Sequence, residues 1–303
     1  MAGGGSWSAA VLQLLKRMNS FHSQGSSRSS CRPLYVAGQQ VGMVQPRVAA
    51  HLADYPDVFR LSPGELGPVE LCAGLSTYEE RSRALRRVLD HWRHLQLFGC
   101  LRGWRDESYD VMPRFCDLPL LQLERSAASL FGIKTYGVHV NGFTRLPDGG
   151  MAMWVGRRAH SKPTFPGMLD NLAAGGLAAG LGVKETLVKE CAEEASIPEC
   201  VARRARAVGS VSYTYEDARG IFPECQFVYD LEVPADLVPQ VEDGEMLEFY
   251  LWPLEQVREA IVGPEFKPNC ALVALDFLIR HGVVDADGER YYQQFIEGLH
   301  REL

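Results

Sequence analysis

The sequence predicts an α/β fold of α+β type, a sandwich with a mixed sheet that follows a smaller α+β region. Strand-like segments lie on both sides of one acidic helix in the second half of the chain, and an apolar helix follows near the C-terminus. This order is typical of a sheet with helices packed on its faces. The chain has 303 residues, 46% of them hydrophobic, which is enough for one large or two ordinary domains with a substantial core.

The N-terminal fifty residues are basic. No acidic residue precedes Asp54, whereas five basic residues do: Lys16, Arg17, Arg28, Arg32 and Arg47. The segment that starts at Trp7 predicts a short amphipathic helix. This composition resembles a mitochondrial presequence. The alternative is a flexible leader over residues 1–9, followed by the first helix of a domain.

Residues 10–134 predict an N-terminal extension of α+β type, either a separate domain or an elaboration of the sheet that follows. Its clearest element is a helix over residues 78–98, because Leu85, Val88, Leu89 and Trp92 lie on one helical face. The other expected elements are a hairpin, a helical turn, a strand and a helix that ends at Gly132, over residues 34–36 with 41–44, 48–52, 58–61 and 118–131.

Residues 135–290 predict the main domain. Two apolar segments flank the turn at residues 147–150, whose Pro-Asp-Gly-Gly sequence favours a hairpin. The expected strands cover residues 136–144, 151–155, 207–215, 224–233 and 248–254, and the helices that follow them cover 254–262 and 269–281. Residues 291–303 are expected to be a C-terminal tail.

Residues 175–197 carry the most informative chemistry. A glycine-rich turn leads into a helix over residues 183–195, and Pro198 stops it. Glu190, Glu193 and Glu194 stand at positions i, i+3 and i+4 on one helical edge, where neighbouring like charges repel by a few tenths of a kcal/mol. One interpretation is a solvated acidic edge. The other is a site for Mg²⁺ or Mn²⁺, because clustered carboxylate oxygens suit hard cations.

The whole stretch resembles the Nudix box, the signature of hydrolases that cleave diphosphates attached to another moiety. Gly175 opens the box, residues 189–194 fill its acidic core and Ile197 closes it. Three residues depart from the pattern: Leu181 replaces Glu, Lys189 replaces Arg and Ser196 replaces Gly. The three metal-binding glutamates of the family all have counterparts, so the box implies a metal-dependent diphosphate hydrolase.

Further stretches resemble one Nudix subgroup, which is related to the Nudix part of fungal thiamine pyrophosphokinase. They are residues 104–109, 130–133, 136–142, 154–158 and 166–170, and the similarity extends over residues 10–290. This resemblance implies Mg²⁺-dependent hydrolysis of thiamine diphosphate-like compounds. The implied substrates are damaged analogues, such as oxythiamine and oxothiamine diphosphates, which are cleaved to the monophosphates.

The resemblance also implies roles for the acidic residues. Glu190, Glu193 and Glu194 would bind Mg²⁺, or Mn²⁺ in its place, with Glu194 essential for catalysis. Lys189 would orient Glu190 or Glu193. A further carboxylate usually comes from outside the box as metal ligand or base. Glu245, in the acidic segment 242–245, is our candidate, and the alternative is an ordinary acidic turn.

The expected substrate-binding residues lie in two places. Trp104 and Tyr109 are suited to stack on a ligand ring, and Arg105 to bind a phosphate. Alternatively, Trp104 anchors a loop whose charges pair with one another. Basic residues just before the glycine-rich turn are placed to hold a diphosphate, unless they form a solvated loop. With the glycines of the turn, this second set comprises Arg157, Arg158, Lys162, Gly175 and Gly176.

Charge and composition limit the partners. The net charge of −7 argues against a general binder of nucleic acid or anionic membranes, so a small-molecule diphosphate is the expected partner, with a homodimer left open. The eight cysteines include no CxxC pair and indicate reduced thiols of an intracellular protein. No apolar run approaches the ~18 residues of a membrane span. We therefore predict a cytoplasmic protein, with the mitochondrion as the alternative.

Three other functions fit the same sequence. The first is hydrolysis of another substrate, such as a nucleoside diphosphate sugar. The second is a catalytically silent sensor, which the departures at Leu181, Lys189 and Ser196 motivate. The third is an isopentenyl diphosphate isomerase-like activity. It ranks last, because it needs a cysteine and a glutamate across a closed apolar pocket and the sequence offers no convincing pair.

Overall fold

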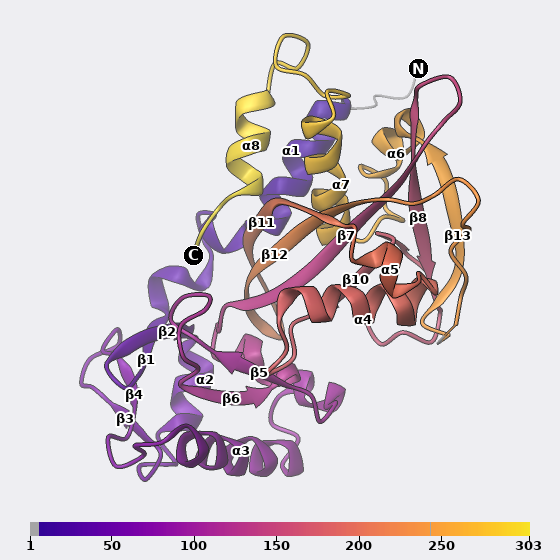
Figure 1. The fold of residues 1–303 in the computed structure, drawn as a ribbon. Coiled ribbons are helices and arrows are strands. Elements are labelled where there is room, and N and C mark those ends of the chain that lie inside the picture. The colour runs from indigo at the N-terminus through magenta and orange to yellow at the C-terminus, as the bar shows by residue number, and fades with distance from the viewer. Residues whose placement is uncertain (1–5, 243) are drawn as a thin grey trace.

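A mixed seven-stranded sheet forms the centre of the second half of the chain in the computed structural model, which describes residues 6–242 and 244–303 (Figure 1). The strand order is β11–β12–β7–β8–β13, with β10 paired to β7 and β9 to β8. β7 runs parallel to β12 and antiparallel to β8. The strands are β7 (Thr135–Arg145), β8 (Met151–Arg158), β9 (Leu169–Asp170), β10 (Ala173–Gly176), β11 (Arg206–Asp217), β12 (Gly220–Glu232) and β13 (Met246–Pro253).

Helices cover both faces of this sheet. Val138 and Val140 of β7 face the core beneath α4 (Val183–Ala195), whereas His139 between them contacts Cys270 of α7 (Pro268–Arg280). Successive side chains of a strand point to opposite faces, so α4 and α7 lie on opposite sides of the sheet. The predicted α/β/α sandwich with a mixed sheet is confirmed. Two shorter helices, α5 (Glu199–Ala202) and α6 (Leu254–Ala260), follow α4 and β13.

The first and last helices meet on the α7 side of the sheet. α1 (Trp7–Met18) packs against α7 and α8 (Tyr292–Leu299). The Trp7 ring meets the Phe295 ring edge-on, with centroids 5.9 Å apart, and its indole N–H donates to the Arg258 carbonyl at 2.7 Å. The first helix, expected within the extension, thus packs on the main domain. Residues 1–5 of the expected leader lie outside the described residues.

The expected tail at residues 291–303 is wrong for most of its length. It contains α8, because Phe295 and Leu299 recur at i and i+4 and are both fully buried against α1 and β11. An apolar pair one turn apart is a weak signal in a short segment. The packing of distant elements, and not local sequence, stabilises this helix.

The extension forms a second core beside the main domain. It contains the sheet β2–β1–β4–β3, the strand pair β5–β6 and two helices. The hairpin, helical turn, strand and helix predicted within residues 34–98 are all present. α3 begins with a capping box between Thr77 and Glu80. The elements are β1 (Arg32–Val36), β2 (Gln39–Val44), α2 (Pro46–Leu52), β3 (Phe59–Leu61), β4 (Val69–Leu71), α3 (Tyr78–His94), β5 (Ser108–Val111) and β6 (Leu121–Glu124).

The helix predicted for residues 118–131 is wrong. Residues Leu121–Glu124 pair with β5, and the 3₁₀ segment η4 (Arg125–Leu130) follows. Leu121 and Leu123 are buried and alternate with a half-buried Gln122, which is a strand period. Pairing with β5 outweighs the local helical preference.

The extension reaches the main domain at the box loop, residues 177–182, which leads into α4. The backbone N–H of Ala179 donates to the Ser108 carbonyl at 2.8 Å, and that of Gly180 to the Asp110 carboxylate at 2.9 Å. β5 is therefore fixed beside the stretch that the sequence singles out.

No helix among the described residues is long and apolar enough to cross a membrane. All eight cysteines lie in described segments, and all are free thiols.

Candidate active site

The box helix forms over the residues that the sequence predicts. α4 spans Val183–Ala195, with Leu187, Cys191 and Ala195 buried as one stripe. It ends at Ser196, which adopts a left-handed conformation with φ 51° and ψ 32°. Glycine adopts this conformation without strain, which explains the glycine of the family pattern. Here the Ser196 hydroxyl donates to the Glu242 carboxylate at 2.8 Å and compensates for part of the strain.

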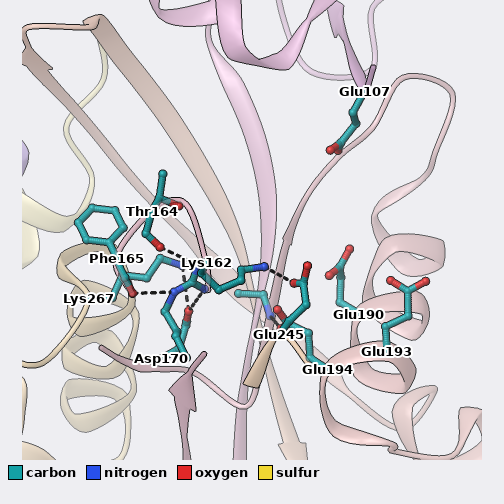
Figure 2. Close-up of polar contacts among 12 residues, drawn as sticks. Glu107, Lys162, Thr164, Phe165, Asp170, Glu190, Glu193, Glu194, Glu245 and Lys267 are labelled. Carbon is teal, nitrogen blue, oxygen red and sulfur yellow. Dashed lines mark hydrogen bonds and ion pairs between the residues drawn. The ribbon is translucent and has the colours of Figure 1, made fainter. Parts of the chain in front are cut away.

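The three glutamates of α4 differ in exposure. Glu194 is 5% exposed, the Glu190 side chain 15% and the Glu193 side chain 50%. Glu194 accepts a hydrogen bond from the backbone N–H of Ala174 at 2.9 Å, which ties α4 to β10. Figure 2 shows Glu190 and Glu194 on the side of α4 toward Glu245, with Glu193 on the outer side. The three carboxylates of α4 therefore range from buried to half-exposed, and the two more buried ones lie on the side of the helix toward Glu245.

The ammonium group of Lys189 forms ion pairs with two of the three glutamates of this acidic edge. Lys189 lies 2.6 Å from the Glu193 carboxylate and 3.3 Å from that of Glu190. Burial raises the pKa of Glu190, and burial together with the nearby charge of Asp170 raises the pKa of Glu194 to about 8. Burial is the main cause of both shifts, so each of these carboxyl groups is costly to ionise in the absence of a bound cation.

The two glycines before the box loop belong to β10 and not to a turn, so that expectation is wrong. A Cβ added at Gly175 would overlap the Glu190 carboxyl group, and one added at Gly176 would overlap the Tyr109 hydroxyl. The absence of side chains lets the Glu190 carboxylate and the Tyr109 ring approach the backbone from α4 and from the extension. Gly175 and Gly176 therefore permit the assembly of the site.

Lys162 and Glu245 form an ion pair that faces the glutamates of α4 (Figure 2). The Glu245 carbonyl also accepts from the backbone N–H of Ala159 at 2.9 Å, just before β13. Burial alone would raise the pKa of Glu245, but the hydrogen bond and the charge of Lys162 lower it. Glu245 is thus ionised at neutral pH. Asp243, in the same acidic segment, lies outside the described residues.

Arg158 is held inside the protein by neighbouring groups. It is buried, and its three nitrogens donate to Asp170 at 2.8 Å, to the Thr164 carbonyl at 3.0 Å and to the Phe165 carbonyl at 3.1 Å. Lys267 adds a second cation, 3.0 Å from Asp170. Burial would raise the pKa of Asp170, but these two cations hold it well below its usual range. Arg158 therefore fastens the loop before β9, in contrast to the expected diphosphate contact.

Arg157 points to the other face of β8. It donates to the Gly167 carbonyl at 2.9 Å and to Glu265 at 3.1 Å, and its guanidinium lies over the Tyr250 ring. Neighbouring residues of a strand face opposite sides, so Arg157 and Arg158 cannot both face one ligand. Of the basic residues expected at the diphosphate, Lys162 is the one placed beside the glutamates.

The extension residues lie at different distances from the site. Trp104 carries the guanidinium groups of Arg86 and Arg93 at 4.6 and 4.7 Å from its ring centre, and its N–H donates to Asp106. This ring anchors a loop against α3, and the structure does not bring it to the glutamates. Arg105 acts on the site through its positive charge, which contributes to lowering the pKa of Glu245. Tyr109 is buried, with its hydroxyl against Gly176.

A hollow of about 40 Å³ lies between the extension and the box loop, and Tyr109 forms part of its wall. Phe115 and Tyr136 also line it, with ring centroids 4.9 Å apart, and Leu181, the residue that replaces the first glutamate of the box, closes another side. We call this space the junction hollow. Flat rings suit an aromatic wall of this kind.

The structure adds charged residues that the sequence did not identify as part of the site. Asp170 and Lys267 form the buried pair beside Glu194. Glu224 of β12 accepts from the Tyr213 hydroxyl at 2.6 Å and from Gln226 at 2.8 Å. Asp170 ends one of the stretches that resemble the subgroup, which was a usable signal. Lys267 and Glu224 carry no local signal, because their positions depend on how α7 and β12 pack.

The site fits a divalent cation by its chemistry. Glu190, Glu193 and Glu194 supply hard oxygen ligands, and one ammonium does not balance their charge. Within residues 6–242 and 244–303, no three histidine, cysteine, aspartate or glutamate side chains already converge closely enough to hold a metal. Lys189 lies against Glu190 and Glu193 instead, and Lys162 lies against Glu245. A bound cation would replace those ammonium contacts.

Comparison with known proteins agrees with the box. The NUDIX domain family matches residues 135–270, and a domain family of unknown function, DUF4743, matches residues 10–135. Nudix hydrolase 20 of Arabidopsis thaliana, whose name describes it as chloroplastic, is 42% identical over 266 residues, which cover 86% of this chain and 70% of that protein. Nudix hydrolase 24 of the same plant is 41% identical over 260 residues, with the same coverage.

More distant matches include an uncharacterised protein of Saccharomyces cerevisiae, 40% identical over 67% of this chain and 63% of that one. Among solved structures, DR0079 from Deinococcus radiodurans is similar with a TM-score of 0.41 and 21% identity, over 56% of this chain and 98% of that one. The box, its acidic helix and the extent of the similarity to the two plant proteins lead to one conclusion. The chain belongs to the Nudix hydrolase family and is an enzyme that hydrolyses diphosphates.

Proposed function

We propose that this enzyme is a Mg²⁺-dependent hydrolase of thiamine diphosphate-like compounds. Its preferred substrates in this proposal are damaged analogues, such as oxythiamine and oxothiamine diphosphates, which it cleaves to the monophosphate and phosphate. The observation that carries the proposal is the position of residues 104–109. This stretch resembles the thiamine-related subgroup, and the structure holds its Tyr109 against Gly176, next to the Gly175–Glu190 contact.

Nudix hydrolases generally use divalent metal ions such as Mg²⁺. Glu190, Glu193 and Glu194 would hold the ion here, and Mn²⁺ offers the same coordination chemistry. The bound metal would neutralise charge on the diphosphate and lower the pKa of a water molecule. Glu194 is positioned for this by its hydrogen bond from Ala174, and Lys189 restrains Glu190 and Glu193 through its two ion pairs.

Glu245 is our candidate for the carboxylate outside the box. Its low pKa keeps it ionised, so it can orient or deprotonate a water molecule, and Lys162 determines the direction in which its carboxylate points. Lys162 can also turn from Glu245 to a phosphate oxygen, since both are anionic oxygens within reach of one flexible ammonium. Arg105 adds positive charge from the extension side.

The junction hollow supports a substrate whose diphosphate carries an aromatic group. Tyr109 connects the two parts of the site, because it lines the hollow while its hydroxyl contacts Gly176. We propose that the ring of the substrate occupies the hollow beside Phe115 and Tyr136. Trp104 is no longer the first candidate for stacking, since two arginines already cover its ring.

A substrate panel tests the proposal. Phosphate or monophosphate release is measured for oxythiamine diphosphate, thiamine diphosphate and ADP-ribose, with Mg²⁺ and with chelator. We expect release from the thiamine compounds, fastest from oxythiamine diphosphate, that is lost with chelator and in Glu194→Gln. Faster turnover of ADP-ribose would assign the enzyme to another diphosphate. Binding of a thiamine compound without turnover of any would favour a ligand sensor.

The compartment stays a prediction. The cytoplasm was expected from the composition, while the names of the two plant relatives place those proteins in the chloroplast. The basic residues before Asp54 favour an organelle as the alternative. Imaging of the full chain with a C-terminal tag would decide between the two.

A further inference from the structure

Arg125 of the extension is attached twice to one neighbour. It begins η4 directly after β6, and its backbone N–H donates to the Glu107 carbonyl at 2.8 Å. Its side chain Nη1 donates to the Glu107 carboxylate at 2.9 Å. Both side chains are 32% exposed, so the pair is shielded but not sealed from solvent. The guanidinium is therefore held in one place by residues of the extension alone.

That place is connected to the acidic edge of α4 across β10. The guanidinium lies over the Tyr109 ring, 5.4 Å from its centre, and the Tyr109 hydroxyl contacts Gly176. The preceding residue, Gly175, contacts Glu190 from the other face of β10. Figure 2 shows Glu107 reaching from the extension toward Glu190 and Glu245. A short chain of contacts thus connects Arg125 to the acidic edge.

The charges around Arg125 come from both parts of the protein. Burial would lower its pKa, but Tyr109, Glu107 and Glu190 raise it. The positive charge of Arg125 also opposes the rise that burial causes in the pKa of Glu224, on β12. Arg125 is consequently a permanent cation that contacts the Glu107 carboxylate and lies within electrostatic range of Glu190 and Glu224.

The guanidinium retains unused donor capacity. Only Nη1 makes a side-chain hydrogen bond within the described part of the chain, whereas an arginine has five N–H donors in a fixed fork. The fork matches two oxygens of a phosphate group. An arginine that served only to link β5 and η4 would be expected to direct more of its donors to the protein, as Arg158 does.

We propose that Arg125 binds a phosphate group of the substrate, so that the extension completes the diphosphate site of the Nudix domain. The ligand class is a diphosphate ester of any alcohol. Glu107 positions the guanidinium and leaves its remaining N–H donors for the ligand. The inference rests on diphosphate hydrolysis and not on the thiamine assignment.

Three variants test it: Arg125→Ala, Arg125→Lys and, as a matched control, Arg114→Ala. Arg114 also belongs to the extension and pairs with an aspartate, Asp117, but its side chain is 84% exposed. The probe is methylenediphosphonate, a diphosphate that cannot be hydrolysed, and its binding is measured by calorimetry in the presence of Mg²⁺. The Mg²⁺-induced rise in melting temperature is measured separately, as a readout of the metal site alone.

We expect Arg125→Ala to weaken diphosphonate binding ~10- to 100-fold and to raise KM more than it lowers kcat. Arg125→Lys recovers part of the binding, because it keeps the charge but not the fork, and the Mg²⁺ effect stays unchanged in both. Arg114→Ala behaves as the unaltered enzyme. If Arg125→Ala does not fold, Arg125→Lys decides, with an expected loss of at least ~5-fold.

Equal diphosphonate binding by the unaltered enzyme and the Arg125 variants, whether tight or weak, would overturn the inference. The substrate panel fails independently of this test. Arg125-dependent diphosphonate binding in an enzyme that ignores thiamine compounds would refute the proposed substrate and keep the inference. Turnover of oxythiamine diphosphate with an unchanged KM in both Arg125 variants would support the proposed substrate and refute the inference about Arg125.

Discussion

The acidic edge of α4 and the buried carboxylate of Asp170 lie close together and have opposite charge balances. Asp170 is one carboxylate with two cations, Arg158 at 2.8 Å and Lys267 at 3.0 Å, and its pKa is lowered. On α4, Lys189 pairs with Glu190 and Glu193, whereas Glu194 accepts a hydrogen bond from the backbone N–H of Ala174, and burial raises the pKa of Glu194 to about 8. The number of acidic residues is therefore a poor guide to function, whereas the local balance of charge separates the two regions.

The difference reflects two uses of charge. A carboxylate that is already satisfied by cations contributes to one fixed arrangement of its neighbours, here the loop before β9 and the start of α7. A carboxylate with too little positive charge nearby is costly in the absence of a ligand, and it becomes favourable when a cation binds. The account therefore predicts a functional defect from changes on α4 and a folding defect from changes at Asp170.

The largest effect is expected for Glu194→Gln. The neutral amide removes a charged metal ligand while its oxygen can still accept the Ala174 N–H, so we expect kcat to fall by at least ~10³-fold, since metal ions contribute several kcal/mol to such reactions. The melting temperature without metal should be little changed, because the raised pKa of about 8 already leaves the Glu194 side chain mostly uncharged at neutral pH. Steady-state kinetics and thermal melts measure both, with Glu199→Gln, an exposed glutamate paired with Arg203, as control. A large fall in the melting temperature of Glu194→Gln would contradict the prediction that changes on α4 impair function and not folding.

The opposite pattern is expected for Asp170→Asn. Removing this charge leaves Arg158 and Lys267 buried without their anion, which costs about 3–5 kcal/mol of unfolding free energy. The lowered native pKa means that this contribution is present above the ordinary aspartate pKa and is lost as pH falls through the native value. Urea unfolding should thus show a constant deficit between about pH 5 and pH 8 that shrinks below about pH 4. A deficit that grows on acidification would contradict the assignment.

The elements predicted correctly from the sequence are those whose residues carry a clear periodicity and a clear start or stop signal. The helix over residues 183–195 follows from its apolar stripe, its glycine start and Pro198, and the helical period then places Glu190, Glu193 and Glu194 on one edge. The paired strands on either side of residues 147–150 follow from their apolar content and turn. Residues 121–124 and 292–299 were missed, because their state depends on partners distant in sequence, β5 for the first and α1 for the second.

The site was predictable only in part, for the same reason. The box identifies the glutamates, but the surroundings of Arg157 and Arg158 depend on which face of β8 each occupies. Arg125, Glu224 and Lys267 reach the site from η4, β12 and the start of α7, and no spacing in the sequence connects these segments. Gly175 and Gly176 were expected in a turn, and their close contacts with Glu190 and Tyr109 became visible only in three dimensions.

The smallest effect is expected for Ser196→Gly, at the end of α4. Glycine relieves a left-handed conformation that costs a serine about 1 kcal/mol, but it loses the 2.8 Å hydrogen bond to Glu242, worth about 0.5–1.5 kcal/mol. The two changes nearly cancel, so the unfolding free energy should stay within about 1 kcal/mol and kcat should not change. Ser196→Ala keeps the strain and loses the bond, so it should be the less stable variant. Greater stability of Ser196→Ala than of Ser196→Gly would show that the strain is negligible.

Stabilisation by Mg²⁺ tests the central claim most directly, that the acidic edge of α4 is built for a cation. A ligand that binds only the folded state at about 100 times its dissociation constant stabilises a protein by about 2.7 kcal/mol. Thermal melts with increasing Mg²⁺ should therefore shift upward for the unaltered enzyme and for Glu199→Gln, and should not shift for the double variant Glu190→Gln/Glu194→Gln. Equal shifts in all three proteins, or no shift in any, would contradict the claim.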